Sequence, residues 1–258
     1  MTYSIIAREP RTGELGIAVA SRFFAVGSLV PHLRGGVGAF ATQALANPVY
    51  GVDGVAMLAD GVPPEAVAQR LTARDGGREH RQFHLIDAQG RGAAFTGQAC
   101  MDWAGHRMAD NVSVAGNILA GPRVVDEMLD AYLRSDGLPF AERLLLALDA
   151  AEAAGGDRRG QQSAALVICR DQDYPWLSVR TDDHADPLGE LRRLYAVAQE
   201  QYLHFADMLP TRENPAGVTD REAYRRRVAE HEAARAAEGL GSRSHATSRP
   251  DREDAGLD

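Results

Sequence analysis

The sequence contains no lysine, so all 28 of its basic residues are arginine. A mechanism that uses a lysine as a base or in a Schiff base is therefore excluded, because an arginine stays protonated. Acidic residues number 36 and the net charge is -8. This balance indicates no basic face, and we expect no nucleic-acid partner.

Cysteines and long apolar runs are also scarce. The two cysteines, Cys100 and Cys169, are typical of a reduced, cytosolic protein. No apolar run approaches the ~18 residues of a membrane span, and the first residues lack the pattern of a secretory signal. We therefore expect a cytoplasmic location and no membrane partner.

The order of the predicted elements indicates the fold class. Runs of strands alternate with pairs of helices, which favours an α+β fold over a doubly wound parallel sheet. Turn residues and apolar periodicity predict strands at 3–7, 14–20, 36–42, 80–87, 91–96, 111–119, 162–169 and 176–180. They predict helices at 52–59 and 64–74, helices opening at Gly121-Pro122 and Leu138-Pro139, a long helix from Asp186 to Phe205, and a loop at 103–107.

Composition changes near Pro210, after which the chain is charged and poor in large apolar residues. We predict a domain over residues 1–209, a charged helical tail over 210–240 with its helix at 220–238, and a disordered end over 241–258.

Two cofactor patterns can be weighed and set aside. His80 and His84 share one strand face but lie about 13 Å apart at ~3.3 Å per residue, too far for one metal ion. The glycines at 36 and 38 precede no helix, unlike a dinucleotide-binding loop. The sequence therefore predicts neither a metal nor a cofactor.

Thr2 is the residue most clearly suited to act as a catalytic group. If Met1 is removed, Thr2 carries a hydroxyl and a free α-amino group, whose reference pKa is about 7.7–8.0. A nucleophile and its base would then belong to one residue, which is a known way to activate a threonine. Many proteins begin with Met-Thr and make no use of it, so Thr2 alone decides nothing.

Several long, dispersed motifs carry a family resemblance over about residues 2–205. They are Thr2-Tyr-Ser-Ile-Ile-Ala-Arg8, Gly16-Ile-Ala-Val-Ala-Ser-Arg22-Phe-Phe-Ala-Val-Gly27, Ala41-Thr-Gln-Ala44, Asn47-Pro48, Trp103-Ala-Gly-His-Arg107, Gly116-Asn-Ile-Leu-Ala-Gly-Pro122, Gly156-Asp-Arg-Arg-Gly-Gln-Gln-Ser163 and Asp182-Asp-His184. The chain resembles a bacterial family of uncharacterised proteins similar to the N-terminal nucleophile (Ntn) hydrolases. That resemblance implies a four-layer αββα sandwich of two antiparallel sheets between helical layers.

The resemblance also implies an amidohydrolase that cleaves a C–N bond in a small-molecule amide or a short peptide. Thr2 would be the nucleophile, and Asn117, with a backbone N–H near Gln43 and Ala44, would hold the oxyanion. Asn117 could equally be a strand-end residue that bonds its own backbone. Substrate-binding or orienting roles are predicted for Arg22, Gln43, His106, Asp157 and Gln161, although ion-pairing, capping or turn roles suit these residue types as well.

One departure from the proteasome-like branch of that superfamily keeps a second hypothesis open. That branch has an Asp before Ser-Arg and a downstream Lys, where this chain has Ala20 and no lysine. These absences favour a catalytically silent scaffold that binds a small ligand or a protein partner. Thr2 and the polar motifs favour the hydrolase, and the resemblance leaves a homo-oligomer through the outer helices open.

Overall fold

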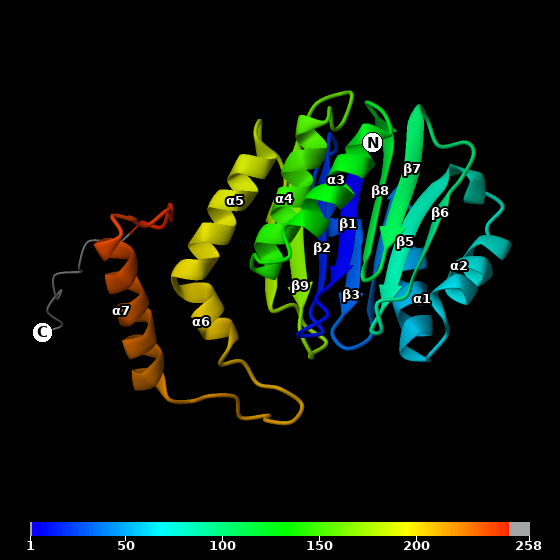
Figure 1. The fold of residues 1–258 in the computed structure, drawn as a ribbon. Helices are drawn as coiled ribbons and strands as arrows, with labels where there is room; N and C mark the ends of the chain where they lie inside the picture. Colours follow the sequence, from blue (N-terminus) through cyan, green and yellow to red (C-terminus); the bar gives the residue numbers. More distant parts are fainter. Residues whose placement is uncertain (1, 248–258) are drawn as a thin grey trace, which may run out of the picture.

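Residues 2–247 are described by a computed structural model (Figure 1). They contain two antiparallel sheets. The larger sheet has the strand order β10-β9-β2-β1-β8-β7. Its strands are β1 (Thr2–Arg8), β2 (Leu15–Ser21), β7 (Trp103–Ala109), β8 (Val112–Leu119), β9 (Ser163–Cys169) and β10 (Leu177–Thr181). The smaller sheet has the order β3-β4-β5-β6, with β3 (Pro31–Arg34), β4 (Gly38–Ala44), β5 (Arg81–Asp87) and β6 (Gly92–Thr96).

Helices cover the outer face of each sheet, and the inner faces meet (Figure 1). The smaller sheet is covered by α1 (Pro48–Ala59) and α2 (Pro64–Ala73). The larger sheet is covered by α3 (Arg123–Arg134), α4 (Phe140–Ala153) and α5 (Pro187–Val197). The predicted α+β class is confirmed. No helix within residues 2–247 is long and apolar enough to cross a membrane.

Strand periodicity explains how one strand serves two cores. Tyr3, Ile5 and Ala7 of β1 point toward α3 and α4, where they join a large apolar cluster. Ile6, on the opposite face, packs between the sheets with Ile17 of β2 and other aliphatic residues. A third cluster, which includes Phe40 and Phe83, lies between the smaller sheet and its two helices.

Two predicted boundaries change for local reasons. The first helix begins at Pro48 rather than near residue 52, because Oδ1 of Asn47 accepts the backbone N–H of Val49 at 3.1 Å and caps the helix. Residues 103–107, predicted as a loop, belong to strand β7, which pairs with β8 along its length. The predicted loop was therefore wrong, because strand pairing outweighed the turn-forming glycine.

Two further elements differ from the prediction. Strand β3 (Pro31–Arg34) was not predicted, and its short, half-buried stretch pairs with β4 alone. The long helix predicted to end at Phe205 runs on without a break but changes type. Its last part is a π-helical turn, Ala198–Tyr202, followed by α6 (Leu203–Ala206).

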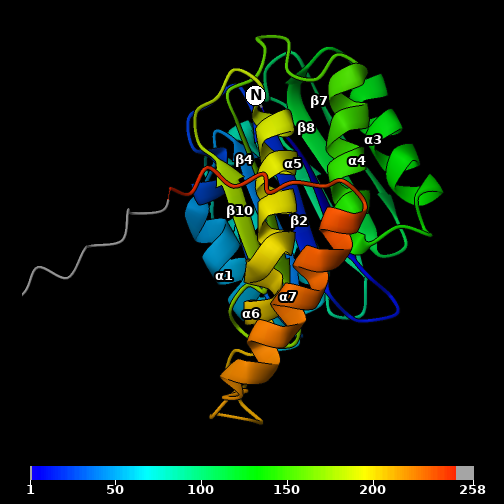
Figure 2. The same ribbon diagram turned by 90° about the vertical axis from the view of Figure 1, so that its left-hand side faces the viewer.

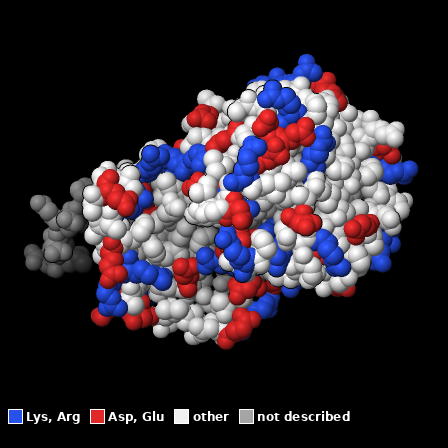
Figure 3. Space-filling view, viewed as in Figure 1, with Lys and Arg blue, Asp and Glu red and all other residues white. Residues whose placement is uncertain are grey.

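The charged helix predicted over 220–238 is α7 (Arg221–Ala237), with Asp220 as its N-cap. It lies beside α6 (Figure 2), where Tyr224 meets the ring of Phe205 with centroids 6.2 Å apart. On the face in Figure 3, arginine and acidic side chains are interspersed. Residues 240–247 have no regular secondary structure, and the predicted disorder of 248–258 lies outside the described residues.

Candidate functional site

The candidate site begins at Thr2, at the start of a central strand of the larger sheet. Thr2 shares the inward-facing parity of Ser4 and Ile6, so its side chain points to the space between the sheets. The hydroxyl of Thr2 lies 3.2 Å from that of Ser21, at the end of β2. Thr2 is 7% exposed. Two hydroxyl groups therefore meet at the edge of a nearly closed site.

Asn117 lies directly opposite Thr2 in the pairing of β1 with β8. Its Nδ2 donates to Oε1 of Gln82 at 3.0 Å and to the backbone carbonyl of Thr2 at 3.4 Å. The pairing of β8 with β7 is irregular here, with Asn117 and Ile118 opposite the single residue Ala104. Such a bulge re-aims side chains. Asn117 itself keeps the inward parity of Ser113 on β8, and its amide reaches the Thr2 carbonyl.

Gln82 is the centre of a buried polar layer between the sheets. Its Nε2 lies 2.8 Å from the carbonyl oxygen of Gly116 and 3.2 Å from that of Gly105. Backbone carbonyls only accept hydrogen bonds, so this end of the side chain must be the nitrogen. Oε1 then accepts from Asn117 and, at 2.8 Å, from Nε2 of Gln43.

The orientation of the Gln82 side chain determines which of the other groups in the layer donate and which accept hydrogen bonds. Because the Gln43 nitrogen is used, its Oε1 accepts from the Ser4 hydroxyl at 2.7 Å. The Ser4 oxygen must then accept from Nε2 of His84 at 2.8 Å, which leaves Nδ1 of His84 to accept from Ser113 at 2.9 Å. Burial lowers the pKa of His84 to about 3, so the imidazole is neutral, as this arrangement requires.

His106 connects to the same layer from strand β7. Nε2 of Gln82 donates to the Thr96 hydroxyl at 3.0 Å, and the Thr96 hydroxyl lies 3.0 Å from Nδ1 of His106. Burial, and then the charge of Arg107, lowers the pKa of His106. Polar contacts therefore run from His106 through Thr96 and Gln82 to Asn117, and His106 is separated from Thr2 by this chain.

Arg22 and Asp157 meet beside the Ser21 end of β2. The buried carboxylate of Asp157 accepts the backbone N–H of Arg22 at 2.8 Å and pairs with Arg159 at 3.2 Å. The Arg22 guanidinium donates to Oε1 of Gln162 at 3.0 Å. Asp157 thus holds the backbone of the loop that follows Ser21.

Gln161 lies on the helical side of the larger sheet, away from the polar layer. Its Nε2 donates to Oε1 of Glu152 at 2.8 Å, and the other oxygen of Glu152 accepts from Tyr3 at 2.6 Å. Burial, followed by the charge of Glu152, raises the pKa of Tyr3 well above its usual range. Thr2 and Tyr3 are successive residues of β1, so their side chains point to opposite faces of the sheet. Gln161 therefore lies on the Tyr3 side of the sheet, and the Thr2 side chain lies on the other.

Arg34 and Ala20 have partners outside the polar layer. Arg34 pairs with Asp173 at 2.7 Å. Ala20 is buried in the apolar cluster on the helical side of β2, and Ser21 is the β2 residue that faces the Thr2 hydroxyl. The described residues contain no group of three or more His, Cys, Asp or Glu placed to hold a metal ion.

A cavity of about 280 Å³ adjoins the site. Asn117 and Ile118 form one wall, and the strand ends and loops around Ala44 and Cys100 form the rest. Its full lining is Ala44, Leu45, His80, Ala99, Cys100, Met101, Asn117 and Ile118. Asn117 therefore contacts both the cavity and the backbone of Thr2.

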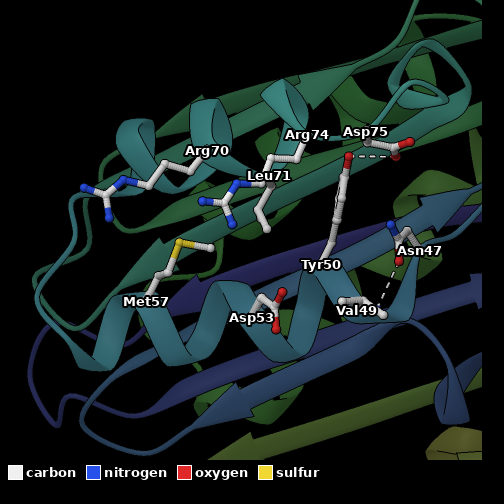
Figure 4. Close-up of a pocket in the computed structure, with 9 residues that line it drawn as sticks. All are labelled: Asn47, Val49, Tyr50, Asp53, Met57, Arg70, Leu71, Arg74 and Asp75. Carbon is white, nitrogen blue, oxygen red and sulfur yellow. Dashed lines mark hydrogen bonds between the residues drawn. The ribbon is translucent and has the colours of Figure 1, made fainter.

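A second cavity, of about 380 Å³, lies between α1 and α2 on the outer face of the smaller sheet (Figure 4). There the Tyr50 hydroxyl donates to Asp75 at 2.8 Å. Hydrogen bonds, first from Arg81, lower the pKa of Asp75 to about 2. The smaller sheet separates this cavity from the polar layer.

Sequence reasoning missed Ser21, Ser4, Gln82, His84 and Ser113 as members of the site. A signal for four of them was present in the predicted strands. Ser4 and Ser113 are each flanked by apolar residues, and Gln82 and His84 alternate with Phe83 and Leu85. Alternation along β1 places Ser4 on the same face as Thr2. Which strand faces meet, however, depends on the packing of the two sheets.

These features define the chain as an α+β protein in which two facing antiparallel sheets enclose a polar layer next to Thr2. The chain belongs to the family of unknown function DUF1028, whose model matches residues 2–191.

The solved structures similar to this chain include protein SPO2555 from Silicibacter pomeroyi, of the same family. It is 34% identical, with a TM-score of 0.79 over 85% of this chain and 96% of the other. Anbu (ancestral beta-subunit) from Yersinia bercovieri is 15% identical, with a TM-score of 0.36 over 81% and 98% of the two chains. An Anbu (Gly-1) mutant from Hyphomicrobium sp. strain MC1 is 16% identical, with a TM-score of 0.38 over 82% and 99%. The two Anbu scores are too low to support a conclusion about this chain. Among curated proteins, none matches it.

Proposed function

We propose that this chain is an Ntn amidohydrolase that cleaves the C–N amide bond of a small molecule or short peptide. Thr2 is its nucleophile once the bond between Met1 and Thr2 has been cut. The observation that carries this proposal is the position of the Thr2 hydroxyl, which lies between the sheets, 3.2 Å from Ser21 and opposite Asn117. The order of layers, with helices outside two facing sheets, supports the αββα sandwich of that superfamily (Figure 1).

The proposed reaction uses groups on three strands. The α-amino group of Thr2 takes the hydroxyl proton, directly or through the Ser21 hydroxyl, while the Thr2 oxygen attacks the substrate carbonyl. The resulting oxyanion competes for the Asn117 amide. It replaces the long 3.4 Å bond to the Thr2 carbonyl, because hydrogen bonds to a charged oxygen are stronger. The leaving amine takes up the proton, and water then hydrolyses the ester on Thr2.

In this proposal, Arg22, Asp157 and His106 act indirectly, by holding the groups around Thr2 in place. Asp157 holds the backbone of Arg22, next to Ser21, through a 2.8 Å hydrogen bond. His106 and Gln43 support Asn117 through Gln82. We therefore regard these residues as positioning groups rather than as groups that touch the substrate.

The first experiment is the intact mass of the untagged protein, followed by an amide-hydrolysis screen. A mass without Met1, and turnover that is lost in Thr2→Ala but retained in Thr2→Ser, is expected. The exposed Thr219→Ala is the matched control and should keep full activity. Turnover that survives in Thr2→Ala would refute Thr2 as the nucleophile.

The second candidate function is a silent scaffold that binds an amide-like ligand. It is favoured by the contact of the Thr2 hydroxyl with another hydroxyl, that of Ser21, at 3.2 Å, because a hydroxyl is too weak a base to activate the threonine. Complete retention of Met1, together with ligand binding and no turnover, would support this function in place of the hydrolase.

A further inference from the structure

The cavity beside Thr2 is bounded mainly by apolar side chains. Leu45 and Met101 are 61% and 68% exposed at its mouth, and Ile118 is half-buried in its wall. The polar residues in the lining are His80 and Asn117, with the weakly polar thiol of Cys100, and the lining includes no arginine, aspartate or glutamate. A charged ligand group placed here would lose its water without gaining an opposite charge from the lining, which is costly.

Two further apolar side chains are exposed at this end of the larger sheet. Phe23 and Phe24 come two and three residues after Ser21 and are 55% and 61% exposed. β1 begins where β2 and β8 end, so Phe23 and Phe24 lie at the same end of the larger sheet as Asn117. Clustered exposed apolar residues mark a surface that binds something.

Backbone strain in two walls of the cavity is a second, independent observation. Ile118 has φ 55° and Ala44 has φ 65°, in the left-handed region that residues with a Cβ rarely adopt. For a β-branched residue such as Ile118 this conformation is a genuine outlier. Strain of this kind is concentrated at functional sites. Here it holds the Ile118 side chain on the cavity wall, next to Asn117.

The volume limits what could bind. At ~30 Å³ for each water in the liquid, a cavity of about 280 Å³ has room for roughly nine water volumes. A short acyl chain of fewer than about ten heavy atoms fits this space, and a longer chain would extend through the mouth into solvent.

We propose that this cavity takes the acyl part of the amide substrate and selects a short, uncharged, apolar acyl group. This inference rests on the proposed function, because the cavity is linked to Thr2 through one residue, Asn117, which lines the cavity and donates to the Thr2 carbonyl. The occupancy of the cavity can nevertheless be measured without turnover.

Cys100 supplies the measurement. It is half-buried in the cavity lining, whereas Cys169 is 1% exposed in strand β9. Burial raises the pKa of the Cys100 thiol, and its Sγ donates to the carbonyl of Arg81 at 3.4 Å, so alkylation with iodoacetamide should be slow and best followed near pH 8.5. The rate is read at Cys100 by peptide mass spectrometry, in full-length Thr2→Ala, which removes any hydrolysis through Thr2.

Primary amides of increasing acyl length are the probes, from acetamide through butanamide to hexanamide, with succinamate as the charged probe of similar size. We expect hexanamide to protect Cys100, and its affinity to rise by up to about fourfold for each methylene buried. Succinamate should not protect. Met101→Asp should abolish protection, and Val52→Asp, at an exposed apolar residue on α1 outside the cavity, should leave protection unchanged.

The two proposals fail in different ways. Protection by hexanamide without any turnover in the wild type would uphold the apolar cavity and count against the hydrolase. Equal protection by succinamate, or no protection by any amide, would overturn the apolar cavity even if some other amide were hydrolysed.

Discussion

Replacing Gln82 with glutamate tests the proton arrangement of the polar layer. Gln82→Glu keeps the oxygen that accepts from Gln43 and Asn117 but replaces the amide nitrogen with a second oxygen. That oxygen would face the carbonyls of Gly105 and Gly116, at distances of 3.2 and 2.8 Å in the wild type. A carboxylate cannot donate to a carbonyl, so the glutamate must be protonated to fit.

The size and sign of the effect follow from this requirement. Gln82 is fully buried, so the folded pKa of the new glutamate should rise well above its reference value of about 4.3. Between the two pKa values the folded state binds more protons than the unfolded state, so stability falls as pH rises. At about 1.4 kcal/mol for each pKa unit, a rise of two to three units costs roughly 3–4 kcal/mol at pH 7.5 that is absent at pH 4.

The assay is urea unfolding followed by tryptophan fluorescence at pH 5.0 and pH 7.5. The difference in unfolding free energy between wild type and Gln82→Glu should grow by roughly 1.7–2.7 kcal/mol over this interval for a pKa rise of two to three units. Gln89→Glu, at an exposed residue between β5 and β6, is the matched control and should show no such growth. A difference that stays constant within about 0.5 kcal/mol would refute the assignment of donors and acceptors around Gln82.

Two further predictions concern other buried ionisable groups. Glu9→Gln should destabilise the protein by about 3–5 kcal/mol in urea unfolding, because the buried Arg143, 2.8 Å from the Glu9 carboxylate, loses its closest anionic partner. A loss below about 1 kcal/mol would mean that water reaches Arg143. The folded pKa of His84, about 3, lies below the unfolded value, so this residue's contribution to stability is complete above pH ~6.5 and is lost by about 1.4 kcal/mol per unit as pH falls toward 3. His84→Gln should remove that slope, shrinking the stability lost between pH 7 and pH 5 by about 2 kcal/mol, and an unchanged slope would contradict the buried neutral imidazole.

Much of the fold could be predicted from the sequence because its signals are local. Alternating or continuous apolar residues predicted most strands, and proline at the starts of helices predicted the helices near 64, 122, 139 and 187. The wrong predictions occur where pairing with a distant strand determines the secondary structure. Residues 103–107 carry a glycine and few apolar residues, yet β8 pairs with them and makes them a strand.

The residues of the site were harder to predict from the sequence than the fold, and the reason is geometric. Thr2 and Asn117 were singled out from the chemistry of an N-terminal nucleophile, and the structure does bring them together. Gln161, singled out in the same way, lies on the opposite face of β1, with Glu152 and Tyr3. A residue next to a strand in sequence can project to either side of the sheet, and a shift of one position reverses its side.

The polar layer itself argues against a purely structural role for this end of the molecule. Between the sheets, one half of the contact is aliphatic, with Ile6, Ile17 and Ile86 at its centre, and needs no hydrogen bonds. The other half, toward Thr2, is built from amides, hydroxyls and an imidazole that must all be satisfied together. Replacing such a layer with apolar residues of similar volume is often neutral or stabilising, so cohesion of the sheets does not require it.

What the layer adds is orientation. Through Gln82, two backbone carbonyls determine which way the Asn117 amide points, and Asn117 both lines the cavity and donates to the Thr2 carbonyl. A scaffold without a ligand has no need of an amide whose direction is specified through several hydrogen bonds. Under the proposed function, this oriented amide would receive a substrate carbonyl oxygen that is held beside Thr2 in one orientation.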